Sequence, residues 1–348
     1  MALKDNTLKF SKRQIDDAGN KLVNPESSSE EKESALEILG NFRSCHAYPI
    51  NTFQSTLRYK LNKTGIDYLV SQRLKRTPSM LLKLNRFNNM RLSQMQDIGG
   101  LRVILPTMSE VNDIIKIYRN TQFQHQVKNE KDYINDPKDS GYRCYHIVYK
   151  YKNSINDNYD GLMIELQIRT RLQHAWATAV ETMGTFIDHS LKSSQGPQDW
   201  LDFFSLVGNA FAYIEDTPRL SKYNLFSKSK IFEKVKLEAN RLQVITQLEG
   251  FSQVISKIET DKKQGSLHLV VLDISNNEVR IRTFPKNLIE QASIEYLKEE
   301  SSIGNENRKQ VVLVSSSSLD SLKKAYPSYF LDTQEFVKTI KEILEKKN

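Results

Sequence analysis

The sequence predicts an α/β fold, a mixed β-sheet flanked by helices, because the spacing of its apolar residues changes along the chain. Helical spacing dominates the first hundred residues. Three later stretches, GLRVILP (100–106), YHIVYKYK (145–152) and GLMIELQIRT (161–170), alternate or run apolar at strand length. With 348 residues, the chain is long enough for two or three domains.

The N-terminal half begins with predicted helices. In NPESSSEEKESALEILGNF (24–42), acidic residues precede an apolar-periodic run, which suits the N-terminus of a helix. We expect residues 52–87 to continue as helix, broken near Thr77-Pro78, with a new helix starting at Ser79. A short helix is expected over 109–120 with Ser109 as its N-cap, and a longer helix over 171–189.

A stretch rich in Ser, Gln, Gly and Pro over 193–199 indicates a linker. It divides the chain into two predicted domains, 1–195 and 196–348. The second is expected to be helical with a small β-hairpin. Its predicted elements are helices over 199–216 and 230–259, a hairpin over 267–284 around Asn276-Asn277, a strand over 309–318 and a helix over 332–347.

The net charge of +8 is unevenly distributed. Residues 51–100 contain nine Lys or Arg against two Asp or Glu, so this stretch alone carries +7. Such a stretch is either a solvated basic face or a surface that binds phosphates, in a nucleotide or a nucleic acid. Charge alone leaves both interpretations open.

Composition also excludes several classes of protein. The two cysteines, Cys45 and Cys144, are too few for a disulfide framework or a zinc finger. The first thirty residues contain no apolar signal segment. No apolar run approaches the roughly 20 residues of a membrane span. We therefore expect a cytoplasmic protein without a membrane partner.

Two carboxylates stand at or inside predicted strands. Asp97 precedes IGGLRVIL, and Glu165 lies within MIELQIRT. Burying an unpaired charge costs several kcal/mol, so each must face water or a partner. Together they could hold Mg²⁺ and leave positions for phosphates. Alternatively, each forms a structural ion pair with Arg102 or Arg169.

Cationic and aromatic residues gather in two further stretches. Guanidinium and ammonium groups bind phosphates, and a tyrosine beside a loop glycine can stack on a base. A solvated helix face and a core tyrosine are the alternatives. No Gly-rich phosphate loop of the Walker type is present. The first stretch contains Arg73, Lys75, Arg76, Ser79, Lys83 and Arg86, and the second Lys131, Lys138, Tyr142, Arg143 and His146.

Taken in order, SQRLKRTPSMLLKL, MQDIGGLRVI, KDYINDPKDSGYRCYH and IELQIRT resemble the successive motifs of the RelA/SpoT synthetase domain. The resemblance covers residues 40–190. It implies a nucleotidyltransferase-like fold and a pyrophosphokinase, which transfers a pyrophosphoryl group from ATP to a 3′-hydroxyl while AMP leaves. The His-Asp pair of the hydrolase domain in long RelA/SpoT proteins is not visible, which implies another means of control.

The resemblance also implies roles for individual residues. Tyr142 would stack on the acceptor base. Glu165 would either share the Mg²⁺ ion or take the proton of the attacking hydroxyl, and both roles stay open. The implied sites are an ATP site of Arg73, Lys75, Ser79, Lys83 and Arg102, a catalytic and Mg²⁺ site of Asp97 and Glu165, and an acceptor site of Lys131, Lys138, Tyr142, Arg143, His146, Gln167 and Arg169.

The layout of the whole chain resembles the CapRel type of fused toxin–antitoxin. In that type, a C-terminal pseudo-zinc-finger domain carries a Tyr-x-x-Tyr motif that blocks the ATP site until a phage protein engages it. Tyr326 and Tyr329 in AYPSYF match the motif. Two core tyrosines beside a turn are the alternative. The resemblance therefore implies a self-restrained toxin of anti-phage defence.

The acceptor is open between two branches of the family. One branch modifies the 3′-CCA end of tRNA and halts translation, and we favour it because of the CapRel-like layout and the basic stretch. The other uses GDP or GTP and makes the alarmones ppGpp and pppGpp. A third hypothesis is a non-catalytic nucleotide-sensing module. It would be indicated by loss of Asp97 or Glu165, and both are present.

Overall fold

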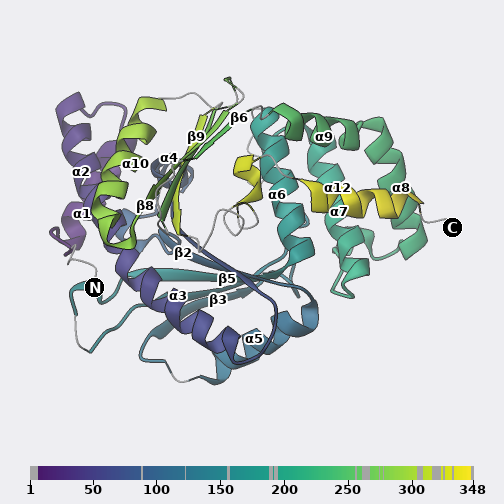
Figure 1. Ribbon diagram of the computed structural model, residues 1–348, viewed down its shortest axis with the longest axis horizontal. Helices are drawn as coiled ribbons and strands as arrows, with labels where there is room; N and C mark the ends of the chain where they lie inside the picture. Colours follow the sequence, from purple (N-terminus) through teal and green to yellow (C-terminus); the bar gives the residue numbers. More distant parts are fainter. Residues whose placement is uncertain are drawn as a thin grey trace.

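A computed structural model describes most of the chain (Figure 1). The described residues are 7–87, 89–121, 123–154, 157–187, 191, 195–254, 257–260, 267–273, 275–276, 278–303, 309–315, 323, 326–330 and 333–345. The helices before residue 190 are α1 (Lys12–Val23), α2 (Ser29–Cys45), α3 (Ala47–Asn62), α4 (Thr77–Arg86), α5 (Met108–Asn120) and α6 (Arg171–Phe186). Those after it are α7 (Gln198–Ile214), α8 (Lys228–Arg241), α9 (Val244–Val254), α10 (Ile289–Ile303) and α12 (Gln334–Glu345).

Strands from both halves of the chain form one mixed sheet. Its order, among the described residues, is β3-β4-β5-β2-β1-β9-β7-β8-β6, with β2 parallel to β5 and β6 parallel to β8. The mixed α/β class is thereby confirmed. The strands are β1 (Leu69–Leu74), β2 (Gly99–Leu105), β3 (Gln126–Asp132), β4 (Tyr145–Lys150), β5 (Met163–Thr170), β6 (Lys257–Thr260), β7 (Leu267–Asp273), β8 (Glu278–Phe284) and β9 (Lys309–Ser315).

The sheet continues across the predicted linker through β1 and β9. These strands pair antiparallel at Gln72–Ser315 and Arg73–Val314. The hairpin of β7 and β8 is confirmed, but it belongs to this larger sheet and is no isolated small hairpin. The C-terminal segment therefore contacts the strand that carries Arg73 directly.

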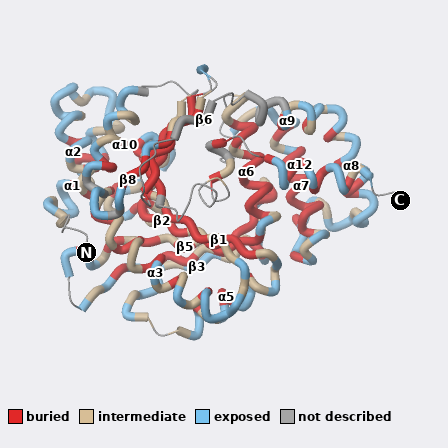
Figure 2. The backbone as a smooth tube through the Cα atoms, viewed as in Figure 1, coloured by how far each residue is buried: buried red, intermediate tan, exposed pale blue. Residues whose placement is uncertain are grey.

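Helices pack on the sheet and beside it (Figure 1). α3 and α5 cover one face of the N-terminal strands, and Figure 2 colours much of β2 and β5 as buried. Side chains on this face, such as Leu101, Leu166 and Ile168, form the main buried core. α10 covers the same side of β7 and β9, around Val271 and Leu313. Helices α6–α9 and α12 share a separate core, so the C-terminal helix returns to the helices that follow α6.

Several predicted elements differ from the observed ones, and α4, for example, begins at Thr77 and not at Ser79. Residues 69–74 were expected to be helical, yet they form β1, because hydrogen bonding to β2 and β9 on both sides outweighs the local helical period. Helix α5 begins after Thr107, whose backbone N–H donates to Glu110 at 2.9 Å, so Ser109 is not its N-cap. The expected helix over 230–259 is broken at Gln243, which has φ +50°, and its last residues form β6.

Candidate active site

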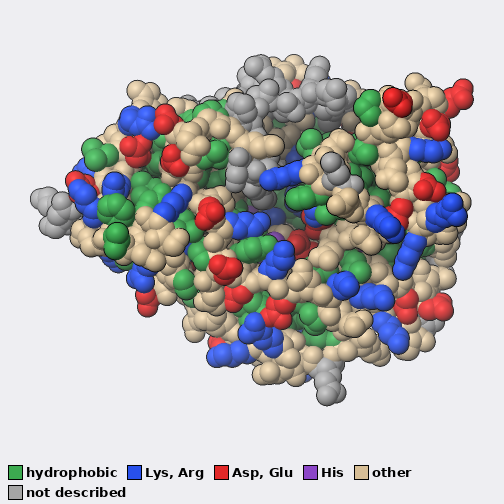
Figure 3. All heavy atoms as spheres, turned by 180° about the vertical axis from the view of Figure 1, so that it is seen from behind, with side chains coloured by type: hydrophobic (Ala, Val, Ile, Leu, Met, Phe, Trp, Pro, Cys, Tyr) green, Lys and Arg blue, Asp and Glu red, His purple; other side chains and the backbone are tan. Residues whose placement is uncertain are grey.

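The registers of four neighbouring strands place polar side chains on one face of the sheet. Arg102 pairs with Gln167 across β2 and β5, and Gln167 pairs with His146 across β5 and β4. Because alternate residues of a strand share a face, this face opposes the main core. It carries Arg73, Arg102, His146, Glu165, Gln167 and Arg169, with Lys131 of the edge strand β3 opposite His146. A hollow with charged and histidine side chains is visible near the centre of the molecule in Figure 3.

Asp97, just before β2, is held by two lysines. Its Oδ2 is 3.0 Å from Lys75 Nζ, and its Oδ1 is 2.9 Å from Lys83 Nζ. Burial alone would raise the pKa of Asp97, but the two ammonium groups lower it below its usual range. Lys75 and Lys83 therefore meet at one carboxylate, and Ser79 lies between them in the first turn of α4.

Glu165 is held by the residues beside it on the sheet. His146 Nδ1 lies 2.9 Å from Glu165 Oε1, and Gln167 Nε2 donates to Oε2 at 2.7 Å. Burial and, to a lesser degree, the charge of Asp97 act to raise the pKa of Glu165, but the hydrogen bond and charge of His146 lower it overall. Both carboxylates of the predicted site are thus ionised near neutral pH.

The residues fit a metal that is only partly held by protein. Within the described ranges, no group of three or more His, Cys, Asp or Glu could hold a metal alone. Asp97, just before β2, and Glu165, on the adjacent strand β5, nevertheless supply ionised oxygens. One or two carboxylates plus substrate phosphates is the usual environment of Mg²⁺.

The loop between β3 and β4 carries Tyr142, which is only 8% exposed. Its hydroxyl lies 2.9 Å from His146 Nε2, and its ring packs against Tyr133 and Trp176. Lys138 Nζ lies 5.2 Å from the ring centroid. Burial raises the pKa of Tyr142 to about 12. Because the Tyr142 ring is buried against other side chains, a base could stack on it only after those side chains move.

His146 joins the two halves of the predicted site. Burial alone would lower its pKa, but Tyr142, Cys144 and Glu165 raise it well above its ordinary value. A doubly protonated imidazole donates from Nδ1 to Glu165 and from Nε2 to Tyr142, which accounts for both contacts. His146 thus couples the acceptor loop to the strand that carries Glu165.

Arg143 does not approach the polar face as expected. It is 4% exposed, and its guanidinium donates to the carbonyls of Gly141 at 3.1 Å, Gly208 at 2.7 Å and Pro218 at 2.9 Å. Arg169 is also buried, and its Nη2 lies 2.5 Å from His174 Nδ1. Because the Arg143 guanidinium donates to these three backbone carbonyls, the side chain joins the loop to the segment 208–218 and is not oriented to bind acceptor phosphates.

Tyr326 lies on the same side of the sheet, beside the predicted adenine site. It is 4% exposed, its hydroxyl donates to the carbonyl of Gln72 at 2.8 Å, and the guanidinium carbon of Arg102 lies 5.9 Å from its ring centroid. Tyr326 also packs with Phe330 on apolar side chains of β7–β9. The side chain of Tyr329 lies outside the described residues.

Sequence reasoning missed contacts from distant segments. The backbone N–H of Thr77, the first residue of α4, donates to Glu300 of α10 at 2.9 Å. Arg76 Nη1 lies 3.4 Å from Gln310 of β9. These partners are separated by more than 220 residues, and no local pattern identifies them. Gly208, inside the helical pattern of α7, is a residue whose type signals close packing.

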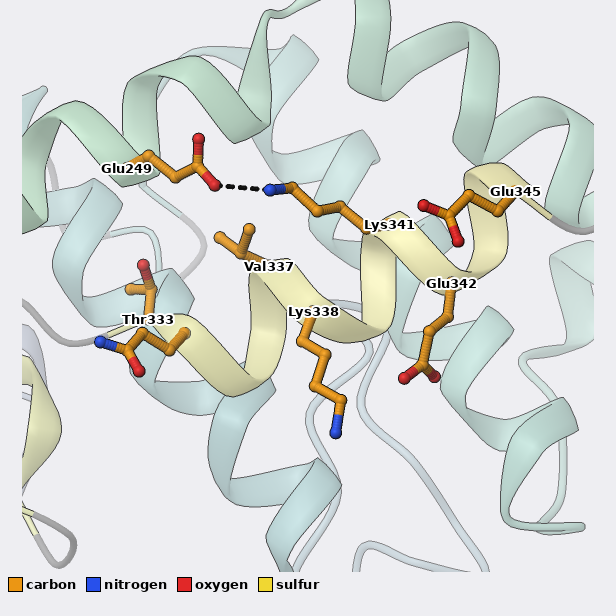
Figure 4. Close-up of a pocket in the computed structure, with 8 residues that line it drawn as sticks. Glu249, Thr333, Val337, Lys338, Lys341, Glu342 and Glu345 are labelled. Carbon is orange, nitrogen blue, oxygen red and sulfur yellow. Dashed lines mark hydrogen bonds and ion pairs between the residues drawn. The ribbon is translucent and has the colours of Figure 1, made fainter.

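A surface pocket of about 340 Å³ lies elsewhere, between α9 and α12 (Figure 4). Glu249 and Lys341, 2.7 Å apart, form an ion pair across it. Its lining contains none of the predicted site residues. Across the described ranges, no helix has the length and apolarity needed to cross a membrane.

Comparisons with known proteins concern the region that carries these residues. Residues 72–185 match the family described as "Region found in RelA / SpoT proteins". The chain is 33% identical over 135 residues to the GTP pyrophosphokinase YjbM of Bacillus subtilis. The aligned region covers 38% of this chain and 59% of that protein. It is 30% identical over 82 residues to the GTP pyrophosphokinase YwaC of the same organism, covering 24% of this chain and 39% of that one.

The matches therefore span about three fifths and two fifths of those two relatives. Among solved structures, small alarmone synthetase 2 from Bacillus subtilis aligns with a TM-score of 0.43 and 19% identity, over 49% of this chain and 92% of that one. The matched residues 72–185 include the end of β1 and all of α4, β2, β4 and β5, with Asp97 just before β2 and Glu165 on β5. The chain therefore contains a region of the RelA/SpoT type at residues 72–185.

Proposed function

We propose that this protein transfers the pyrophosphoryl group of ATP to the 3′-hydroxyl at the CCA end of tRNA, and that its C-terminal half restrains this activity. One observation carries the transferase part of the proposal. Two ionised carboxylates, Asp97 just before β2 and Glu165 on the neighbouring strand β5, lie in the matched region, and Lys75 and Lys83 both bind Asp97. This is the charge arrangement that phosphoryl transfer requires.

In the proposed reaction, the acceptor oxygen attacks the β-phosphorus of ATP. A new O–P bond forms, and the bond from the β-phosphorus to the oxygen that bridges it to the α-phosphate breaks. AMP leaves with that bonding pair. Arg73 and Arg102 hold the adenine. Lys75 and Lys83, which bind Asp97 in the structure, bind phosphate oxygens of ATP instead. A Mg²⁺ ion held by Asp97 and Glu165 would neutralise phosphate charge.

The hydrogen bonds of Glu165 favour one of its two open roles. An efficient general base has a pKa near the working pH. The pKa of Glu165 is instead lowered, and both of its oxygens already accept hydrogen bonds, from His146 and Gln167. We therefore assign Glu165 to holding the metal and orienting the hydroxyl, with the proton passing to solvent.

The restraint is proposed from contacts of the C-terminal segment with the ATP side. Tyr326 reaches Gln72 and faces Arg102, while β9 extends the sheet at Arg73. An adenine held between Arg73 and Arg102 would have to displace the Tyr326 ring. This supports a CapRel-like arrangement in which a partner, such as a phage protein, draws the segment away. In that arrangement the regulating residues lie after the division near residue 195.

GDP or GTP is the second candidate acceptor. It is favoured by the relatives, since YjbM and YwaC are both named GTP pyrophosphokinases. That product would be ppGpp or pppGpp. The two candidate acceptors differ in size. The affinity for tRNA, a long polyanion, increases more with basic surface outside the site than the affinity for GDP or GTP does.

The deciding experiment offers deacylated tRNA and GDP/GTP side by side with ATP labelled at the γ-phosphate. The full-length protein, its Tyr326→Ala variant and its Glu165→Gln variant are compared. Label in tRNA, stronger with Tyr326→Ala and lost with Glu165→Gln, is the expected result. Label in guanosine nucleotides would assign the second function. No label in either acceptor with Tyr326→Ala would contradict the proposal of a restrained transferase.

A further inference from the structure

Helix α7 lies directly under the loop that the proposed function assigns to the acceptor, which we call the acceptor loop (residues 137–144). Ser205 Oγ donates to the carbonyl of Asp139 at 2.6 Å. The Arg143 guanidinium bridges the loop carbonyl of Gly141 to the helix carbonyl of Gly208. The loop is thus bound to the helix at both ends of its tight turn.

The two backbones touch at a pair of glycines. A Cβ on Gly208 would lie 2.7 Å from the Gly141 Cα and 2.7 Å from its carbonyl oxygen. Gly141 has φ +90°, and a Cβ there would lie 3.1 Å from the Phe204 carbonyl. Glycine is disfavoured inside helices, so its presence in the middle of α7 fits a need for close approach. Neither backbone has room to shift toward the other.

The same helix also fixes the ring on which the acceptor base would stack. Trp176 Nε1 donates to the Phe204 carbonyl at 2.9 Å, and the Trp176 ring packs against Tyr142. Glu215, the residue after α7, binds Thr170 at the end of β5 and Gln173 in the first turn of α6. Helix α7 therefore contacts the acceptor loop directly, the Tyr142 ring through Trp176 of α6, and the end of β5 through Glu215.

We propose that α7 positions the acceptor loop, so that Ser205 and Gly208 are positioning residues that set the affinity for the acceptor. The proposal rests on the proposed function for the identity of the loop. Helix α7 follows the predicted linker, so the C-terminal segment both restrains the ATP side and builds the acceptor side. Removal of all residues after 195 would remove the support of the loop along with the restraint.

The test compares single variants of the full-length protein with matched controls. Ser205→Ala removes the hydroxyl that holds Asp139, while Ser227→Ala removes a comparable hydroxyl at the N-cap of α8, where it accepts from Lys230 N at 3.3 Å. Gly208→Ala introduces the clash with Gly141, while Gly40→Ala adds a Cβ in α2 whose neighbour is at 3.4 Å. Initial rates are measured with the acceptor varied and with ATP varied.

For Ser205→Ala we expect the KM for the acceptor to rise roughly five- to tenfold, as for loss of one hydrogen bond, with the KM for ATP unchanged. Gly208→Ala should raise it further, and both controls should match wild type. A lower melting temperature with no change in the acceptor KM would make Ser205 merely structural and overturn the proposal. Equal rises in both KM values would overturn it as well.

Amide hydrogen exchange separates this proposal from the proposed function, because it needs no turnover. In Ser205→Ala, the amides of the acceptor loop should exchange faster while those of β2 and β5 keep their wild-type rates. Unchanged exchange in the loop would refute the positioning role even if transfer is observed. Faster loop exchange in a protein that labels no acceptor would sustain the positioning role and reject the proposed reaction.

Discussion

The phenol of Tyr326 donates a hydrogen bond to the backbone carbonyl of Gln72, at 2.8 Å and across 254 residues of sequence. Gln72 is the first residue of the matched RelA/SpoT region and precedes Arg73 on β1. This buried contact, together with the pairing of β9 on β1, joins the C-terminal segment to the strand of the predicted ATP site. Its geometry separates two functions of the tyrosine, the hydrogen bond of its hydroxyl and the volume of its ring.

Tyr326→Ala should strengthen ATP binding, because it removes the ring beside Arg102. Tyr326→Phe keeps the ring and removes only the hydroxyl, so its ATP affinity should stay within about twofold of wild type, with stability lower by about 1 kcal/mol. Isothermal titration with a non-hydrolysable ATP analogue measures the affinities, and urea denaturation measures the stability. Equal affinities for all three proteins would mean that Tyr326 is a packing residue.

Glu300→Gln should also strengthen ATP binding, by about two- to fivefold, because the Glu300 carboxylate places negative charge at the start of α4. The glutamine can still accept the hydrogen bond of Thr77, so the fold is retained. Glu299→Gln is the matched control, since Glu299 faces Arg280 and Arg282 and not α4. An equal effect of both variants would indicate a general charge effect of α10.

Glu165→Gln should reduce pyrophosphate transfer by a factor on the order of a hundred or more, because it removes one of the two charges proposed to hold Mg²⁺. The melting temperature and the binding of ATP without metal serve as controls for folding. Transfer at the wild-type rate by a folded Glu165→Gln protein would remove Glu165 from the proposed chemistry.

The ion pair of His146 and Glu165 predicts a pH dependence of stability. The pKa of His146 is raised in the folded protein, so its stabilising effect is full below the ordinary value of 6.5 and is lost as the pH rises through the raised value. His146→Gln should therefore cost about 1.5–3 kcal/mol below pH 6.5 and progressively less above it. Urea denaturation of both proteins over a pH series measures the difference. A difference that grows with pH would contradict the assignment.

Local sequence predicts the strands at the centre of the proposed site. The alternating patterns of β2, β4 and β5 were recognisable, and the strand alternation places Glu165 and Gln167 on one face without further information. The position of Asp97 before a strand and the basic stretch that contains Lys75 and Lys83 single out these residues, and the resemblance to the RelA/SpoT motifs supplies their expected roles. Their meeting at Asp97 is a tertiary contact over 22 and 14 residues, which the structure supplied.

The sequence by itself determined the α/β class, the strands that carry the carboxylates and the family motifs, because these depend on side-chain periodicity and residue type over a few positions. Only the tertiary structure decided that residues 69–74 are a strand, that Arg143 binds Gly208 and that Tyr326 reaches Gln72. The physical reason is that β1 gains its hydrogen bonds from β2 and β9, and Arg143 gains its carbonyl partners from α7. Such contacts arise between residues 25 to 254 positions apart, where local periodicity contains no information about the partner.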